Sequence, residues 1–307
     1  MDKNSTIFVA GASKGIGAAV IDALGQSGYL RLLTTDDARL SDQAAVEAFF
    51  AEHRPEVVVL AAGKSGGISF NVQHPAELIY DNLMTETNVI SSAHRHGAKK
   101  LLYLASSCSY PRLCAQPIKE EYLLTGPLEP TNQPYAVAKI AGIELCRAYR
   151  TQYGCNFIAA VPTNYFGPGD DFSPENSHVV GALMRRMHAA KLEGAEVIDI
   201  WGTGTPRREF IYSKDLAQAC VFLLENYDGA DLLNIGTGTS LSIAELAAAI
   251  GEVLGYTGTF HFDVTKPDGM PVKELDSTRL ARLGWRASTP FVEAVKTTYT
   301  WFLQNTQ

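Results

Sequence analysis

The sequence predicts an α/β protein in which a doubly wound parallel sheet is followed by a smaller C-terminal domain. Three observations support this fold class. Short apolar stretches alternate with helix-length stretches as far as residue 162, and polar loops with shorter elements follow. A glycine-rich turn comes directly after the first apolar stretch. The chain has 307 residues, of which 46% are hydrophobic, so it can bury a core of this size.

The first part of the chain alternates strand and helix signals in order. Pro75 and Pro134 can each open a helix, because the first turn would leave their missing N–H unpaired, and Ser41-Asp42 can cap another. We expect strands at residues 6–10, 30–34, 56–62, 100–105 and 157–161, and helices that end near residues 27, 53, 96 and 153.

The turn between the first strand and the first helix reads GASKGIG over residues 11–17. Glycines allow a tight turn, a close approach of the backbone to a pyrophosphate, and packing of the helix on the strand. The phosphate would meet the unpaired N–H groups of the helix start. We therefore expect a Rossmann-type dinucleotide site that includes Gly11, Ser13, Lys14, Gly15, Ile16 and Gly17.

The elements beyond residue 162 are shorter and separated by polar loops. Residues 179–191 suggest a helix, residues 197–201 a strand, and Ser242 with Glu245 a capping box that opens another helix. A terminal helix starts near residue 290. We expect a dinucleotide-binding domain over residues 1–168, to which residues 210–237 return, and a mainly substrate-binding domain over residues 169–307.

Residues 132–139 read NQPYAVAK and place Tyr135 and Lys139 four positions apart on one helix face. A nearby ammonium favours a phenolate, so we expect Lys139 to lower the pKa of Tyr135, which can then exchange a proton with a substrate oxygen. The alternative is a tyrosine and a lysine on a helix surface without a catalytic role. The strand at residues 100–105 favours catalysis, because it ends in Ser106 and Cys108, where a hydroxyl and a thiol are presented.

Composition excludes several classes of function. Charged residues make up 19% of the chain, the net charge is −7 and there is no basic run, so we expect no nucleic-acid partner. No signal-peptide pattern and no apolar run of membrane-spanning length occur, so we expect a cytoplasmic protein with no membrane partner. Five cysteines without a Cys-x-x-Cys pair indicate neither a disulfide framework nor a zinc site, and we expect no metal.

Serine, tyrosine and lysine in this order, behind a glycine-rich first turn, resemble the catalytic set of the short-chain dehydrogenase/reductase superfamily. Longer strings resemble one family within it, GDP-L-fucose synthase, which acts on GDP-4-keto-6-deoxymannose. The strings run in order along most of the chain. They are AAGKSGGI at 61–68, SSCSYP at 106–111, LEPTNQPYAVAKIAG at 128–142, PENSHV at 174–179, WGTGTPRREF at 201–210 and KPDG at 266–269.

The resemblance implies roles for five catalytic residues. Tyr135 would donate the proton during reduction, Lys139 would lower its pKa and hold the nicotinamide ribose, and Ser106 would hydrogen-bond the substrate carbonyl. Cys108 and His178 match the family's two epimerisation residues, and we assign Cys108 as the base and His178 as the acid. Without the resemblance, His178 would be taken for a hydrogen-bonding residue at a helix start.

The resemblance also implies the residues that hold ligands. Arg186, Trp201, Arg208 and Asp268 match positions that bind the GDP-sugar. Two alternatives stay open: Arg208 pairs with Glu209 at the surface, or Trp201 belongs to the core of the smaller domain. The implied cofactor positions, besides the glycine turn, are Ala61, Ala62, Leu104, Ala105, Ser106, Ser107, Tyr135, Lys139, Pro162, Thr163, Asn164, Tyr165 and His178.

The implied reaction is NADPH-dependent epimerisation at carbons 3 and 5 and reduction of the 4-keto group of a GDP-4-keto-6-deoxy sugar, in a homodimer. A ketone at carbon 4 acidifies the hydrogens on both neighbouring carbons, so a base can form an enolate. Where the family has an arginine that holds the 2′-phosphate of NADP, residues 34–37 read TTDD. A carboxylate there suits the ribose of NAD, whereas Lys14 suits a phosphate, so we favour NADP(H) and keep NAD(H) open.

The exact sugar and the number of inverted carbons stay open as well. Gly15 lies one place later than this family's usual middle glycine, and Ser109 and Phe166 replace residues that are commonly apolar and tyrosine. The alternatives are a GDP-colitose or GDP-6-deoxyheptose synthase and an epimerase that only inverts centres around a tightly bound cofactor. A dinucleotide-sensing binding protein is a further alternative, although such a protein does not need Ser106, Cys108, Tyr135 and Lys139 together.

Overall fold

A computed structural model describes residues 1–174, 176–266 and 268–306; Glu175 and Pro267, which belong to two of the quoted strings, lie outside it. Its main sheet has six strands in the order β2-β1-β3-β4-β5-β9, and every neighbouring pair is parallel. This confirms the predicted fold class. The strands are β1 (Ile7–Ala10), β2 (Leu32–Leu33), β3 (Val57–Leu60), β4 (Lys100–Leu104), β5 (Phe157–Pro162) and β9 (Leu233–Ile235).

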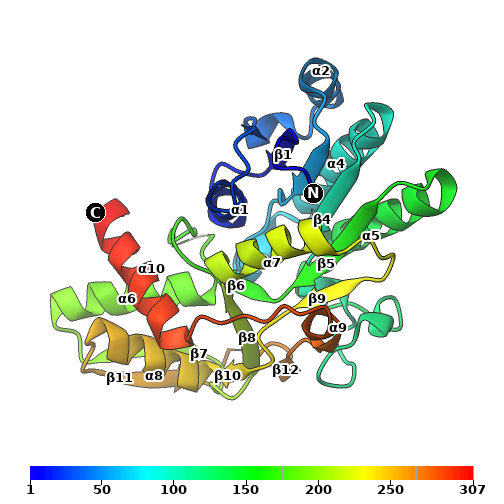
Figure 1. The fold of residues 1–307 in the computed structure, drawn as a ribbon. Helices are drawn as coiled ribbons and strands as arrows, with labels where there is room; N and C mark the ends of the chain where they lie inside the picture. Colours follow the sequence, from blue (N-terminus) through cyan, green and yellow to red (C-terminus); the bar gives the residue numbers. More distant parts are fainter. Residues whose placement is uncertain (175, 267, 307) are drawn as a thin grey trace.

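Helices cover both faces of this sheet because its strands are apolar on both sides (Figure 1). In β1, Ile7 and Val9 pack in a cluster with α1 and α7, whereas Phe8 and Ala10 pack with α2, α4 and α5 on the other face. The bounds of these helices are α1 (Gly15–Gln26), α2 (Gln43–His53), α4 (Pro75–Arg95), α5 (Gln133–Tyr153) and α7 (Ser213–Asn226). Short segments between them are η1 (Asp37–Arg39), α3 (Ile68–Gln73), η2 (Ser107–Ser109), η3 (Glu120–Tyr122) and η4 (Pro130–Asn132).

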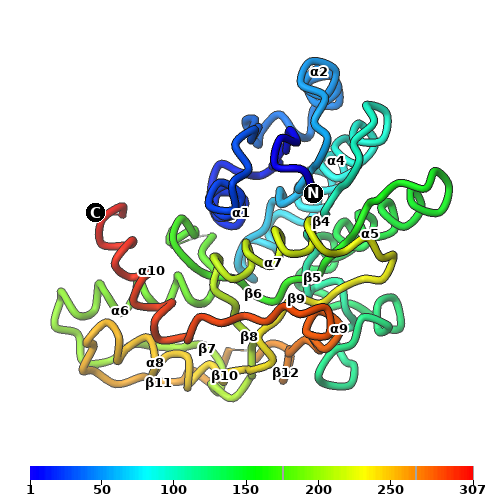
Figure 2. Tube along the Cα trace, in the orientation of Figure 1, coloured from blue at the N-terminus to red at the C-terminus, as the bar shows by residue number. Residues whose placement is uncertain are grey.

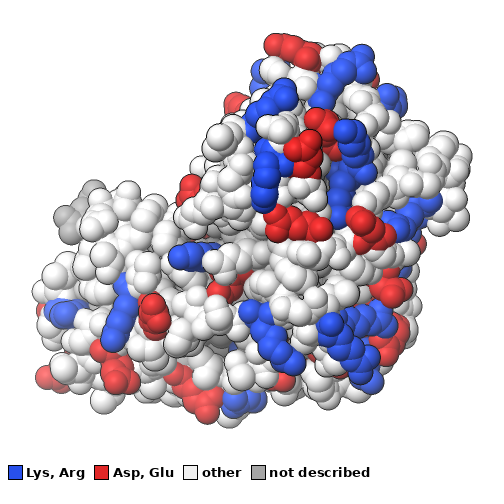
Figure 3. Space-filling model, viewed as in Figure 1, with Lys and Arg blue, Asp and Glu red and all other residues white. Residues whose placement is uncertain are grey.

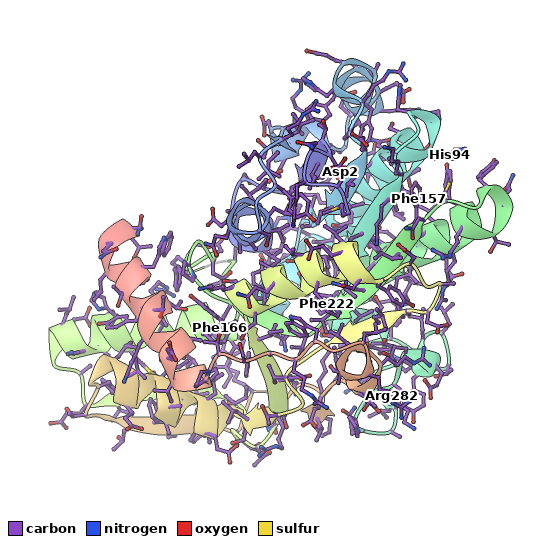
Figure 4. All side chains as sticks on the ribbon, viewed as in Figure 1. Asp2, His94, Phe157, Phe166, Phe222 and Arg282 are labelled. Carbon is purple, nitrogen blue, oxygen red and sulfur yellow. The ribbon has the colours of Figure 1, made fainter. Side chains whose placement is uncertain are left out.

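A second, smaller core is built mostly from residues beyond the fifth strand. Phe166, labelled in Figure 4, packs there against Tyr212 and Phe291. The chain of Figure 2 ends in α10, which lies against α8 in this part. The elements are β6 (Asn164–Phe166), α6 (Val179–Glu193), β7 (Val197–Trp201), β8 (Arg207–Tyr212), β10 (Ser240–Ser242), α8 (Ile243–Leu254), β11 (Thr259–Asp263), β12 (Val272–Lys273), α9 (Thr278–Arg282) and α10 (Phe291–Asn305).

The return of the chain to the main sheet starts later than residue 210. Strand β8 pairs with β6, β10 and β12 in the second sheet, and Phe210 belongs to the second core. Helix α7 then packs on α1, and β9 joins the edge of the main sheet beside β5. The second strand is also shorter than expected, because only Leu32 and Leu33 pair with β1. The predicted capping box is present, with Ser242 and Glu245 bonding reciprocally at the start of α8.

The surface carries both signs of charge. On the face shown in Figure 3, lysines and arginines are interspersed with aspartates and glutamates. Across the parts of the chain that the structure describes, no helix combines the length and apolar character needed to span a membrane.

Candidate active site

The glycine turn brings backbone from two strands into contact. Gly11 has φ +91°, and a Cβ built on it would lie 2.5 Å from the backbone nitrogen of Ala62, at the end of the neighbouring β3. A Cβ on Gly17 would lie 1.9 Å from the carbonyl oxygen of Gly11. Both positions therefore require glycine, and the turn has the compact backbone that a dinucleotide pyrophosphate needs.

The start of α1 has no side-chain cap, so its N–H groups are open to other partners. The amide of Gly15 donates to the carbonyl of Gly169 at 3.1 Å. Tyr165 approaches the same turn, since a Cβ on Gly15 would lie 2.9 Å from its hydroxyl oxygen. Lys14 extends toward Asp171, with 3.7 Å between Nζ and Oδ2, and its side chain stays mostly exposed. The loop after β6 thus lies directly over the glycine turn.

Acidic residues follow β2, as the sequence suggested, and both are engaged. The Asp36 carboxylate accepts from the Ala38 amide and caps η1. Asp37 accepts from the hydroxyl of Ser13 in the glycine turn, and its second oxygen is buried with no hydrogen-bond partner. A small pocket beside these groups is lined by Phe8, Thr35, Arg39, Leu40, Ala45, Val46 and Phe49. Arg39 is thus a basic residue at this end of the turn that the sequence analysis did not single out.

Tyr135 and Lys139 lie on one face of α5, as predicted, with Nζ 5.9 Å from the phenol ring centroid. The pKa of Tyr135 is nevertheless raised, not lowered. Burial is the main cause and the neighbouring Cys108 adds to it, while a hydrogen bond with Ser106 acts in the opposite direction. Burial thus outweighs any lowering effect of a neighbouring charge on this pKa, and the ammonium of Lys139 is directed to another partner.

That partner is Glu86 on α4, a buried carboxylate that the sequence analysis missed. Its Oε1 lies 3.1 Å from Nζ of Lys139 and also accepts from the hydroxyl of Tyr103 at 2.8 Å. Nζ of Lys139 donates further to the carbonyls of Ala62 at 3.3 Å and Leu104 at 3.4 Å. Lys139 therefore joins the ends of β3 and β4 to the middle of α4 and α5.

Cys108 lies on η2, immediately after Ser106, and three polar groups hold it. Its amide donates to the hydroxyl oxygen of Ser106 at 3.3 Å, and its sulfur accepts from Nδ2 of Asn132 at 3.1 Å and from Nζ of Lys273 at 3.3 Å. Burial alone would raise the pKa of this thiol. The charge of Lys273 and the hydrogen bonds from Ser106, Lys273 and Asn132 outweigh that effect and lower the pKa below its ordinary value of 9.0.

His178 precedes α6 and makes no side-chain capping bond, so the helix-start interpretation fails. Its side chain is solvent-accessible, yet surrounding protein atoms desolvate the ring and lower its pKa below 6.5. Asp171 raises this pKa and Lys273 lowers it further, so the imidazole lies within electrostatic reach of both residues.

The residues matched to GDP-sugar binding come from β7, β8, α6 and the loop before β12. Trp201 is 63% exposed with Nζ of Lys266 over its ring, so it is not a core residue. Asp268 accepts from the amide and hydroxyl of Thr203. Arg186 donates to the carbonyl of Asp199 on β7. Within residues 1–174, 176–266 and 268–306, no hydrogen bond or ion pair joins Arg186 or Trp201 to Ser106, Cys108, Tyr135 or Lys139.

Arg208 does not pair with Glu209. It donates to the carbonyls of Arg207 and Met270, and Cys108, Glu129 and Asp268 contribute to its electrostatic environment. Glu209 is fully buried and accepts from the amides of Thr237, Gly238 and Leu275.

The remaining predicted cofactor residues surround these groups at the strand ends. Thr163 and Asn164 both donate their side chains to the carbonyl of Glu209. Ala61, Ala105, Ser107 and Pro162 lie at or directly after the ends of β3, β4 and β5, and Ile16 is in the first turn of α1.

Besides Arg39, sequence reasoning missed Glu86, Asn132 and Lys273. The signal for Glu86 is a carboxylate three and four positions before Val89 and Ile90 in a long helix, where an apolar residue would be expected on the buried face. Asn132 stands inside a quoted string, two residues before Pro134. Lys273 stands in a short strand with no motif around it, and only the pairing of β12 with β8 places it here.

Fold and site together define a dinucleotide-binding α/β protein with a Ser-Tyr-Lys set at the carboxyl ends of its strands. The model of the NAD dependent epimerase/dehydratase family matches residues 7–236, and the chain belongs to this family and, within it, to the GDP-L-fucose synthase family. GDP-L-fucose synthase 1 of Arabidopsis thaliana is 51% identical over 306 residues, which are 99% of this chain and 95% of the relative.

Solved structures of related enzymes have the same fold. A GDP-6-OMe-4-keto-L-xylo-heptose reductase from C. jejuni superposes with a TM-score of 0.94 at 33% identity, covering 99% of both chains. A GDP-L-fucose synthetase from Naegleria fowleri bound to NADP superposes with a TM-score of 0.91 at 29% identity, covering 100% of this chain and 96% of that one.

Proposed function

We propose that the chain epimerises carbons 3 and 5 of GDP-4-keto-6-deoxymannose and reduces carbon 4 with NADPH, giving GDP-L-fucose. The observation that carries this proposal is the convergence of Ser106, Cys108, Tyr135 and Lys139 at the carboxyl ends of β3 and β4. In this arrangement, Ser106 and Tyr135 can donate hydrogen bonds to the substrate carbonyl oxygen. The thiol of Cys108, whose pKa is lowered, can act on the carbons next to that carbonyl.

Epimerisation starts with removal of a proton next to the ketone. The Cys108 thiolate takes that proton, so an S–H bond forms, the C–H bond breaks and its electron pair moves into an enolate whose charge rests on the oxygen at carbon 4. Ser106 and Tyr135 donate hydrogen bonds to that oxygen. His178 returns a proton from the opposite face, which inverts the centre. The same pair acts at carbons 3 and 5.

Reduction uses the same oxygen. NADPH, when bound, supplies the hydride that reduces carbon 4. Tyr135 donates the proton that the new hydroxyl requires, since its phenol is protonated at neutral pH. Lys139, held by Glu86, positions the phenol and the nicotinamide ribose.

The cradle at the glycine turn fits a dinucleotide, because side chains at Gly11 and Gly17 would fill it. We propose that residues 1–168, with the segment that returns as α7 and β9, hold NADP(H), and that residues of the second part hold the GDP-sugar. Lys14 and Arg39 are the basic groups near the turn that can meet a 2′-phosphate. Arg208, Arg186, Trp201 and Asp268 would hold the diphosphate and nucleoside.

A second candidate substrate is a GDP-4-keto-heptose. The close superposition on a heptose reductase favours it, as does the replacement at Ser109. Two further alternatives use the same site chemistry. One is a GDP-colitose synthase, and the other is an enzyme that epimerises the sugar without a net reduction.

The test is to supply GDP-4-keto-6-deoxymannose with NADPH, follow the loss of absorbance at 340 nm and identify the product by NMR. Oxidation of NADPH with formation of GDP-L-fucose supports the proposal. If neither NADPH nor NADH is oxidised with GDP-4-keto-6-deoxymannose but a GDP-4-keto-heptose is turned over, the chain would be assigned to the second candidate.

We further propose a cytoplasmic homodimer joined through α4 and α5. These two helices pack side by side, and Tyr80, Val137 and Tyr153 expose apolar surface on them. A four-helix contact between two copies would cover this surface, and sedimentation equilibrium measures the mass directly.

A further inference from the structure

Lys273 reaches the candidate active site from an element remote in sequence. Strand β12 pairs in parallel with β8, with Lys273 opposite Arg208. The lysine side chain is almost completely buried, and its Nζ lies 3.3 Å from the sulfur of Cys108. A buried ammonium without a compensating partner is costly, so this position needs an electronegative partner.

The thiol is the partner that the structure supplies. Within residues 1–174, 176–266 and 268–306, no carboxylate oxygen lies within 4.0 Å of Nζ of Lys273. Lys139, by contrast, has Glu86 at 3.1 Å. The site therefore holds two buried lysines with different partners: one paired with a carboxylate and one directed at a sulfur.

The surroundings of the sulfur favour its ionised form. Asn132, from η4, donates to it from a second direction, and the Cys108 amide bonds to Ser106, which limits the movement of this segment. The other titratable groups around it are Arg208 on β8 and Tyr135 on α5. Arg208 also favours a thiolate and a neutral Tyr135 leaves it undisturbed, but Lys273 is the charged group that donates a hydrogen bond to the sulfur.

We propose that Lys273 is a positioning residue that holds Cys108 as a thiolate aimed at the substrate for proton abstraction. This inference rests on the proposed function for its chemical purpose. The ammonium keeps its proton throughout: the thiolate forms the S–H bond, the substrate C–H bond breaks, and the electron pair passes to the enolate. The charge of Lys273 also lowers the pKa of His178, so a protonated His178 gives up its proton more readily. The same charge therefore favours both proton transfers of the epimerisation.

The test compares Lys273→Met, which removes the charge, with Lys273→Arg, which keeps it, and with Lys296→Met on the exposed face of α10 as a matched control. The first readout needs no substrate: the rate of Cys108 alkylation by iodoacetamide across pH, measured on the Cys108 peptide by mass spectrometry. We expect the midpoint to move up by about one pH unit in Lys273→Met. Lys273→Arg should stay close to wild type, and the control should not move.

The second readout is deuterium exchange into the GDP-sugar. Lys273→Met should slow it by about tenfold or more at neutral pH with little change in KM, and higher pH should restore part of the loss. An unshifted alkylation midpoint in a Lys273→Met protein with wild-type melting temperature would overturn the proposal. If Lys273→Met does not fold, an alkylation midpoint of Lys273→Gln equal to that of wild type does the same. If the alkylation midpoint shifts in Lys273→Met but the wild type exchanges no deuterium into the GDP-sugar, the role of Lys273 in holding Cys108 as a thiolate stands and the proposed reaction is rejected.

Discussion

Nζ of Lys139 lies 3.1 Å from Oε1 of Glu86, and both side chains are almost completely buried. Burial raises the pKa of Glu86, and the charge of Lys139 with the hydrogen bond from Tyr103 opposes that rise. The pair joins α4 to the face of α5 that carries Tyr135. The carboxylate gives the buried Lys139 side chain a partner of opposite charge, while the carbonyls of Ala62 and Leu104 accept from the same Nζ.

Glu86→Gln should destabilise the protein by about 1–3 kcal/mol, because the buried ammonium loses its charged partner while the hydrogen bond can persist. The matched control is Glu144→Gln, since Glu144 pairs with Arg147 at 2.6 Å on the exposed part of the same α5. We expect the control to cost less than about 0.5 kcal/mol. Urea unfolding of both variants measures the difference. Equal effects would show that the buried pair has no special role.

Gly17→Ala should weaken NADPH binding by tenfold or more and destabilise the fold by about 1–3 kcal/mol, because the new Cβ collides with the carbonyl of Gly11. Gly25 stands in the same helix with open space around it. Gly25→Ala should therefore stabilise the protein by about 0.5–1 kcal/mol and leave binding unchanged. Fluorescence titration with NADPH distinguishes the two. Normal NADPH affinity in Gly17→Ala would contradict the proposed cradle.

Lys14→Met should raise KM for NADPH several-fold and leave KM for NADH unchanged. The Lys14 ammonium is mostly exposed and only loosely paired with Asp171, so it is available to a 2′-phosphate. Lys214→Met, on the exposed side of α7, serves as the control. If Lys14→Met affects both cofactors equally, its role lies at the pyrophosphate, and Arg39→Met becomes the variant expected to change the preference.

Deuterium exchange should have its optimum at a lower pH than an ordinary cysteine–histidine pair would give. The productive state needs an ionised Cys108 and a protonated His178, and its population is greatest midway between the two pKa values. Both pKa values are lowered, from 9.0 and 6.5 respectively, so the optimum should lie below about pH 7.8. An exchange-rate profile with a maximum at or above that pH would contradict the assignment.

The sequence was sufficient for the fold because its strands are strongly apolar and its helices start at clear signals such as Pro75 and Ser242. It was also sufficient for the Tyr135–Lys139 pair, whose spacing is local. It was insufficient for Glu86 and Lys273, which reach the site only through the packing of α4 on α5 and the pairing of β12 with β8.

The direction of the pKa shift of Tyr135 was also beyond what the sequence could predict. Local spacing indicated that Lys139 lowers the pKa of Tyr135, but burial is the largest influence on this group and raises its pKa. Spacing along one helix shows which groups are neighbours, whereas a pKa depends on all groups around the site and on their exclusion from water.

If one site carries two separable proton transfers, one by Cys108 and one by Tyr135, loss of the Tyr135 hydroxyl should abolish only one of them. The most direct measurement is on Tyr135→Phe with GDP-4-keto-6-deoxymannose and NADPH in deuterated water, recording absorbance and NMR together. We predict that NADPH oxidation falls by about 100-fold or more, because the proton donor is lost, while deuterium still enters carbons 3 and 5. Unchanged NADPH oxidation, or loss of exchange together with oxidation in a folded variant that binds NADPH normally, would contradict the account.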